Sequence, residues 1–153
     1  MQRSKAEIYL HFVWATARRK LLLVPEIERP IHRCIIEEAQ KCGCIVLAIG
    51  GMPDHVHLFV KAPTTAAPAA IAQQVKGISS VFANKSLPLE ERLRWQQHYA
   101  VFSVSRTHVP RAINYVRFQK RHHTSGKLWS VLEETEEEVP GDGLMPPGSA
   151  AGN

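Results

Sequence analysis

The 153-residue sequence has no apolar run long enough to cross a membrane, and its first ten residues, MQRSKAEIYL, lack the apolar stretch of an export signal. Cysteine is scarce: Cys34, Cys42 and Cys44 are the only three, and their C-x-C spacing is not the C-x-x-C of common zinc sites. These absences predict a cytoplasmic protein that is not a membrane protein and whose thiols are reduced.

Basic residues are absent from the end of the chain. All 19 Lys and Arg lie at or before Lys127, whereas residues 133–153 contain six acidic residues and no basic one. Residues 1–132 therefore carry 19 basic against 8 acidic side chains, a formal charge of +11. A body this basic indicates a polyanionic partner, with nucleic acid as the first candidate; a well-solvated surface is the alternative.

The composition also changes near Lys127. We expect one folded domain over residues 1–127 and a tail over 128–153, acidic at first and then rich in glycine and proline. Such a composition predicts partial disorder. One hypothesis is that the acidic run folds over the basic body and competes with bound nucleic acid.

Periodicity predicts alternating strands and helices. The apolar segment 6–17 predicts a strand, and the stripe from Ile27 to Ala39 predicts a helix opened by Pro25 or Pro30 and ended by Gly43. Further strands are expected at 44–51, 55–62 and 99–106, and further helices at 67–86 and 109–123. The order predicts an α+β fold: a ferredoxin-like (RRM-like) split β-α-β antiparallel sheet with helices on one face, plus a C-terminal helix that carries Tyr115.

Two histidines stand one residue apart at the start of the third expected strand. Side chains at i and i+2 share a face of a strand, so His55 and His57 project together. Two imidazoles at that spacing can bind one divalent metal if a further ligand joins them, and Asp54 next to them is a possible oxygen donor or supporting partner. A surface pair, or a pair satisfied by protein groups, is the alternative.

The last expected helix carries Tyr115 and Gln119 four residues apart, on one helical face and beside the packing stripe. An ordinary boundary tyrosine is the alternative. A phenol, with a reference pKa of about 10, is a poor nucleophile at neutral pH, but a cation on a neighbouring phosphate stabilises the charge that develops in the transition state. Tyrosine, two histidines and a divalent ion together indicate covalent cleavage of a phosphodiester.

Four ordered motifs resemble those of the single-tyrosine, HUH-type transposases of small bacterial insertion sequences (the IS200-like group) and of the REP-associated tyrosine transposases. DHVHLFV matches the HUH signature, and VKGISSVFAN resembles a Lys-Gly-x-Ser-Ser segment followed by Asn84. WQQHYAVFSVS and YVRFQKRHH resemble the family's fourth strand and its Tyr-x-x-x-Gln-x-x-His-His helix. The motifs extend from about residue 8 to 123.

The resemblance implies an enzyme that nicks and rejoins single-stranded DNA at element ends, which are folded as hairpins. Tyr115 would be the nucleophile, forming a 5′-phosphotyrosine and releasing a 3′-hydroxyl. His55, His57 and Gln119 would hold Mg²⁺ or Mn²⁺. The resemblance also implies a homodimer, in which the tyrosine helix completes the metal site of its own chain or of the partner.

The same resemblance and the basic charge point to residues that contact DNA. Ala17 stands where the family usually has a lysine, and the three basic residues after it are possible substitutes. The expected contacts are Arg18, Arg19, Lys20, Lys76, Ser79, Ser80, Arg111, Arg117, Lys120, Arg121, His122 and His123. For the lysine and serines of the second motif, sheet packing is the alternative; for the two histidines it is the helix dipole.

Two other classes of function compete with the transposase. A domesticated or inactive relative would bind hairpin DNA or RNA without cleaving it. A metalloenzyme acting on a small molecule would need a closed apolar pocket and would show no salt-dependent DNA binding. Because Tyr115, His55, His57 and Gln119 are all present, the sequence favours the enzyme.

Overall fold

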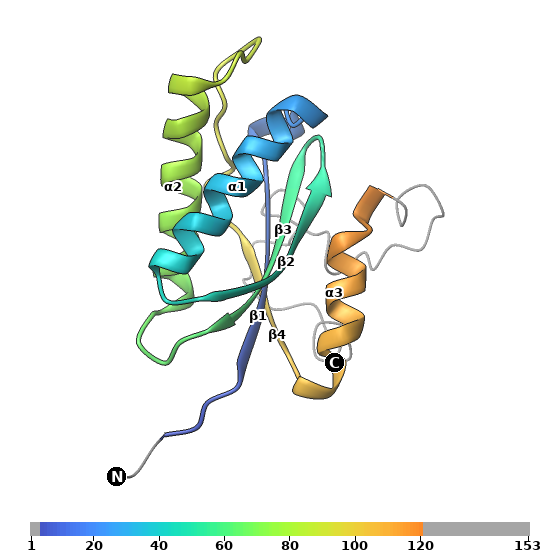
Figure 1. Cartoon of the computed structure of the whole chain (residues 1–153). Coiled ribbons are helices and arrows are strands. Elements are labelled where there is room, and N and C mark those ends of the chain that lie inside the picture. The colour runs from blue at the N-terminus through green and yellow to red at the C-terminus, as the bar shows by residue number, and fades with distance from the viewer. Residues whose placement is uncertain (1–3, 121–153) are drawn as a thin grey trace, which may run out of the picture.

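The computed structural model describes residues 4–120 and consists of a four-stranded antiparallel sheet with helices on both faces (Figure 1). The strands are β1 (Ile8–Ala15), β2 (Ile45–Met52), β3 (His55–Ala62) and β4 (Ala100–Val104), in the spatial order β2-β3-β1-β4. The other elements are α1 (Pro25–Lys41), α2 (Pro68–Ser86), α3 (Val109–Arg117) and the short 3₁₀ helices η1 (Ala17–Arg19) and η2 (Arg106–His108). The predicted α+β fold is confirmed.

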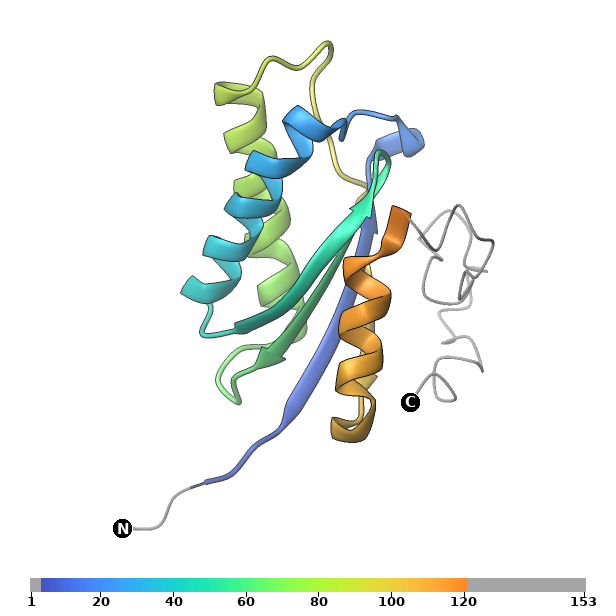
Figure 2. The same cartoon turned by 45° about the vertical axis from the view of Figure 1, so that its right-hand side comes forward.

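Side chains alternate between the two faces of the sheet along β1 and β3. Phe12, Trp14 and Leu58 belong to the main core, under α1 and α2. Val13 and Phe59 belong to a second, smaller cluster under α3, which lies on the opposite face (Figure 2). Because both faces are covered, these strands are apolar at almost every position, and the alternation is visible only in places.

Helix α1 shows how proline and glycine set the limits of an element. It begins at Pro25, whose missing N–H costs nothing in the first turn, while Pro30 lies inside the helix. Of the two prolines proposed to open the helix, Pro25 does so. The helix ends before Gly43, whose φ of 89° is a left-handed conformation that glycine adopts without strain.

The β2–β3 hairpin brings the histidine pair to one end of the sheet. Met52 pairs with His55, so a two-residue turn of Pro53 and Asp54 joins the strands. His55 also pairs with Ala15 at the end of β1. The histidine motif therefore starts at the hairpin turn and runs into the middle of the sheet.

Helix α3 is interrupted within the range that the sequence predicts. The pattern predicts a helix over 109–123; α3 ends at Arg117, Phe118 leaves the helical conformation with φ −111° and ψ 38°, and Gln119 and Lys120 are helical again. Arg121, His122, His123 and the tail over 128–153 lie outside the described residues, so the expectations for them stay predictions. Among the described residues, no helix is both long and apolar enough to cross a membrane.

Candidate active site

A pair of buried imidazoles lies on the sheet face under α3. Nε2 of His11 is 2.8 Å from Nδ1 of His57, and both side chains are buried. The strand register explains the contact, because His57 pairs with Val13 and His11 lies one step further along the same face of β1. His11 is not among the residues that the sequence motifs indicate. Its only signal was a polar residue inside an apolar strand, and its partner became evident only from the register.

The other motif histidine is held from the hairpin turn. Nδ1 of His55 lies 2.7 Å from Oδ1 of Asp54, and Nε of Arg19 donates to Oδ2 of the same carboxylate at 3.0 Å. Burial raises the pKa of Asp54, but the hydrogen bonds and charges of His55 and Arg19 outweigh burial and lower it to about 2. Asp54 therefore stays ionised and orients the His55 ring through Nδ1, with the buried Nε2 on the other side of the ring.

Tyr115 packs against the histidines of its own chain. Its ring lies edge-on to His57, with centroids 5.8 Å apart, and edge-on to His11 at 6.2 Å. The sequence placed Tyr115 beside the packing stripe, and this is wrong: the residue is only 4% exposed and belongs to the cluster of Phe59 and Phe102. The tyrosine is buried because α3 lies flat on the sheet.

Gly50 on β2 permits this close packing. A Cβ atom at Gly50 would lie 2.0 Å from the backbone oxygen of Val116 in α3, which is closer than two non-bonded heavy atoms can approach. The residue after the tyrosine thus rests directly on the sheet backbone. A glycine in β2 therefore sets the depth at which Tyr115 lies.

Gln119 is buried next to the end of α3 and was also wrongly placed at the boundary. It is 1% exposed, and its Nε2 donates to the backbone oxygen of Tyr115 at 2.9 Å. Phe118 interrupts the helix just before this residue, and the Gln119 side chain bonds back to the last turn of α3. Its Oε1 is buried and has no hydrogen-bond partner among the described residues.

These donors fit a divalent metal. A buried amide oxygen without a partner costs about 1–3 kcal/mol, a cost that a bound cation would remove. Among residues 4–120, no group of three or more His, Cys, Asp or Glu is arranged to hold a metal. The candidate set is instead two imidazoles, His55 and His57, and the amide oxygen of Gln119. Such a mixed nitrogen and oxygen set suits Mn²⁺, and also Mg²⁺ when a phosphate supplies more oxygens.

Several residues expected at the DNA already have partners in the protein. Lys76 donates to the backbone oxygens of Gln96, Gln97 and His98 at 2.7, 3.3 and 2.9 Å. Lys120 reaches both carboxylate oxygens of Glu28 at 2.9 Å. These lysines hold segments of the protein together.

The two serines of the second motif differ in exposure. Ser79 is fully buried and accepts a hydrogen bond from Nε1 of Trp95 at 3.1 Å, so its side chain serves packing. Ser80 is half-buried, and Arg111 and Arg117 are exposed on α3. Ser80, Arg111 and Arg117 therefore keep an accessible surface for DNA.

Residues 4–119 match the model of the family described as "Transposase IS200 like". The chain therefore belongs to the IS200-like transposase family, as its motifs suggested.

Three relatives illustrate the match. The chain is 26% identical over 127 residues to the ISDra2 transposase TnpA of Deinococcus radiodurans, an alignment that covers 78% of this chain and 91% of that protein. It is similar to the crystal structure of a protein of D. radiodurans R1 described as a transposase, with a TM-score of 0.62, 24% identity and coverage of 83% and 98%. It is also similar in fold to a REP-associated tyrosine transposase bound to a REP hairpin, with a TM-score of 0.60, 13% identity and coverage of 80% and 73%.

Proposed function

We propose that this transposase nicks and rejoins single-stranded DNA at element ends through a 5′-phosphotyrosine on Tyr115. His55, His57 and Gln119 would hold the divalent ion, Mg²⁺ or Mn²⁺. The observation that carries the proposal is the position of Tyr115: its ring packs on His57, and its backbone oxygen is bonded to the side chain of Gln119. Helix α3 and the residues directly after it thus bring the proposed nucleophile and third ligand toward the histidine pair.

The proposed reaction is a transesterification. The Tyr115 oxygen attacks the scissile phosphorus, the bond from phosphorus to the 3′ oxygen breaks, and the phenol proton ends on that leaving oxygen. A bound divalent ion would neutralise charge on the phosphate in the transition state. Because the new bond is a phosphodiester, another 3′-hydroxyl can reverse the step and rejoin the strand without ATP.

The neighbouring residues would orient the two imidazoles. For His57 to bind a metal through Nε2, its Nδ1 must carry the proton and donate a hydrogen bond to Nε2 of His11. Asp54 acts in the same way on Nδ1 of His55. His11 and Asp54 are therefore positioning residues in this proposal.

The proposed partners are hairpin-shaped DNA ends and a second copy of the chain. The relative bound to a REP hairpin supports a hairpin ligand. In this structure Tyr115 lies on the histidines of its own chain, so a dimer is not needed to bring them together. The homodimer therefore rests on the resemblance alone.

The low exposure of Tyr115 favours a second candidate, a protein that binds hairpins without cleaving them. Only 4% of the residue is exposed, which leaves little surface for a phosphate to approach. In that candidate the buried tyrosine would serve packing alone. The two functions differ in one product, the covalent adduct.

A labelled hairpin oligonucleotide with a single-stranded flank, taken from the DNA beside the gene, tests the proposal. The protein is incubated with it in Mg²⁺ or Mn²⁺ and run on a denaturing gel. We expect a covalent adduct that chelation with EDTA prevents and that Tyr115→Phe abolishes while hairpin binding persists. Tight binding without any adduct would support the second candidate.

A further inference from the structure

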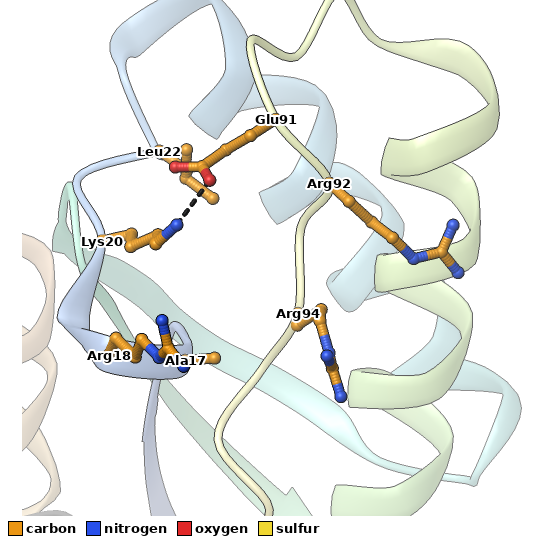
Figure 3. Close-up of a pocket in the computed structure, with 7 residues that line it drawn as sticks. All are labelled: Ala17, Arg18, Lys20, Leu22, Glu91, Arg92 and Arg94. Atoms are coloured by element: carbon orange, nitrogen blue, oxygen red, sulfur yellow. Dashed lines mark hydrogen bonds and ion pairs between the residues drawn. The ribbon is translucent and has the colours of Figure 1, made fainter.

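A cavity of about 380 Å³ lies between η1 and the segment that follows α2, and basic side chains surround it (Figure 3). Arg18 and Lys20 line it from η1 and the residues after it, and Arg92 and Arg94 line it from the opposite wall. Residues some 70 positions apart in the sequence therefore meet here. Arg92 and Arg94 are not among the DNA contacts that the sequence predicts.

The charge in this cavity is largely uncompensated. Lys20 is paired with Glu91, the one acidic residue in the lining. The side chains of Arg18, Arg92 and Arg94 form no ion pair with any described residue. Figure 3 shows the Arg92 side chain directed away from Arg18 and over α2, so these cations are spread along the surface and do not converge on one point. Unpaired cations arranged in this way suit a polyanion with successive charges.

The backbone of η1 holds Arg18 in this position at a cost. Arg18 and Arg19 have φ angles of 59° and 54°, a left-handed conformation that costs a non-glycine residue of order 1–3 kcal/mol. Hydrogen bonds fix the turn, because the N–H of Ala17 donates to the backbone oxygen of Arg94 at 2.8 Å and that of Arg19 to Thr16 at 3.0 Å. Such strain at an over-determined turn is typical of a functional site.

The same turn connects the cavity to the candidate active site. Arg18 lines the cavity, whereas its neighbour Arg19 binds Asp54, the carboxylate that holds His55. The cavity and the support of the histidine pair therefore share the turn η1.

We propose that this arginine pocket, formed by Arg18, Arg92 and Arg94, binds successive phosphodiesters of the single-stranded DNA. The identity of the strand rests on the proposed function. Arg92 and Arg94 also line a second hollow of about 310 Å³ over α2, together with Ser80 and Trp95. A strand bound in the arginine pocket would continue over this hollow.

The test measures binding of a fluorescent single-stranded oligonucleotide by anisotropy over a series of salt concentrations, using the full chain and EDTA so that no cleavage occurs. Each phosphate contact contributes about 0.7 to the slope of log K against log salt. We expect the slope to fall by about 0.7 for Arg94→Gln and by about 1.4 for Arg92→Gln/Arg94→Gln. Arg33→Gln and Arg33→Gln/Lys61→Gln remove the same charge from α1 and β3, and we expect a smaller change for them.

Equal slopes for the pocket and control variants would overturn the proposal. The proposal would also be overturned if the pocket bound only free phosphate. In that case phosphate would raise the Tm of the unaltered protein but not of Arg94→Gln, and the slope for the oligonucleotide would stay the same in both. Because the three arginines are exposed, we expect their variants to fold, and thermal unfolding checks this. The experiment needs no cleavage, so a missing adduct would refute the proposed function and leave the arginine pocket standing.

Discussion

Nε2 of His11 lies 2.8 Å from Nδ1 of His57, which places a third buried imidazole directly behind the histidine motif. This contact fixes the orientation of the His57 ring from within the sheet. It would allow Nδ1 to hold its proton and would leave Nε2 available to the proposed metal. The proposed metal site therefore depends on a residue of β1 that belongs to none of the four motifs.

We predict that His11→Phe lowers Mn²⁺ affinity by about 10- to 100-fold, because the ring packing survives but the partner of Nδ1 is lost. Isothermal titration of the protein with Mn²⁺ measures this without any DNA. His11→Gln retains an acceptor and should recover part of the affinity. The control is His32→Phe, which removes a histidine of α1 outside the site and should bind Mn²⁺ normally; equal affinities in all variants would contradict the role of His11.

Gln119 should have two separable effects. Gln119→Leu removes both the Oε1 atom, which has no hydrogen-bond partner among the described residues, and the Nε2 donor of the same side chain. We expect Mn²⁺ affinity to fall by about tenfold or more. Gln119→Glu keeps an oxygen ligand but no longer donates to Tyr115, so Mn²⁺ binding should persist while the protein is destabilised by about 1 kcal/mol. Titration and chemical denaturation distinguish the two variants. Unchanged Mn²⁺ binding in Gln119→Leu would exclude it as a ligand.

Gly50→Ala should displace the tyrosine helix. The new methyl group would lie 2.0 Å from the backbone oxygen of Val116, so α3 must move away from β2. We expect a loss of stability of about 1–3 kcal/mol and loss of the covalent adduct. Gly77→Ala in α2 is the control, because nothing lies within 4 Å of its Cβ and alanine in a helix should stabilise by about 0.5–1 kcal/mol. A Gly50→Ala protein with normal stability and adduct yield would mean that α3 does not pack as described.

His32 predicts a loss of stability in mild acid. Burial lowers its pKa to about 4, and the opposing charges of Glu28 and Lys120 have smaller effects. Between pH 6.5 and 4 the unfolded chain therefore binds more protons at this residue than the folded chain does, so the free energy of unfolding falls as the pH falls. The contribution is on the order of 3 kcal/mol at most. Urea denaturation at several pH values should show a flatter profile for His32→Phe, and parallel profiles would contradict the lowered pKa.

Much of the fold could be predicted from local sequence signals. Proline and glycine mark the ends of α1, and the short link of residues 52–54 between two expected strands predicts the antiparallel hairpin. The period of two along the third strand correctly puts His55 and His57 on one face. These features depend on residues that are close in the sequence.

The rest required contacts between distant segments. His11 could be joined to His57 only through the register of β1 and β3, and the arginine pocket only through the meeting of η1 with residues 91–94. The burial of Tyr115 was missed because the helical stripe does not reveal that Gly50 lets α3 lie so close to the sheet. Sequence patterns identified which side chains could react, but not how deeply they are enclosed.

Helix α3 also screens apolar surface. Among the described helices it is the one that covers Val13, Phe59 and Phe102. Any displacement that exposes Tyr115 would therefore expose these side chains to water as well. A molecule in which this helix is displaced would expose an apolar sheet face and would tend to self-associate. Light scattering at rising protein concentration would then report how often the helix lifts, independently of any chemistry at the tyrosine.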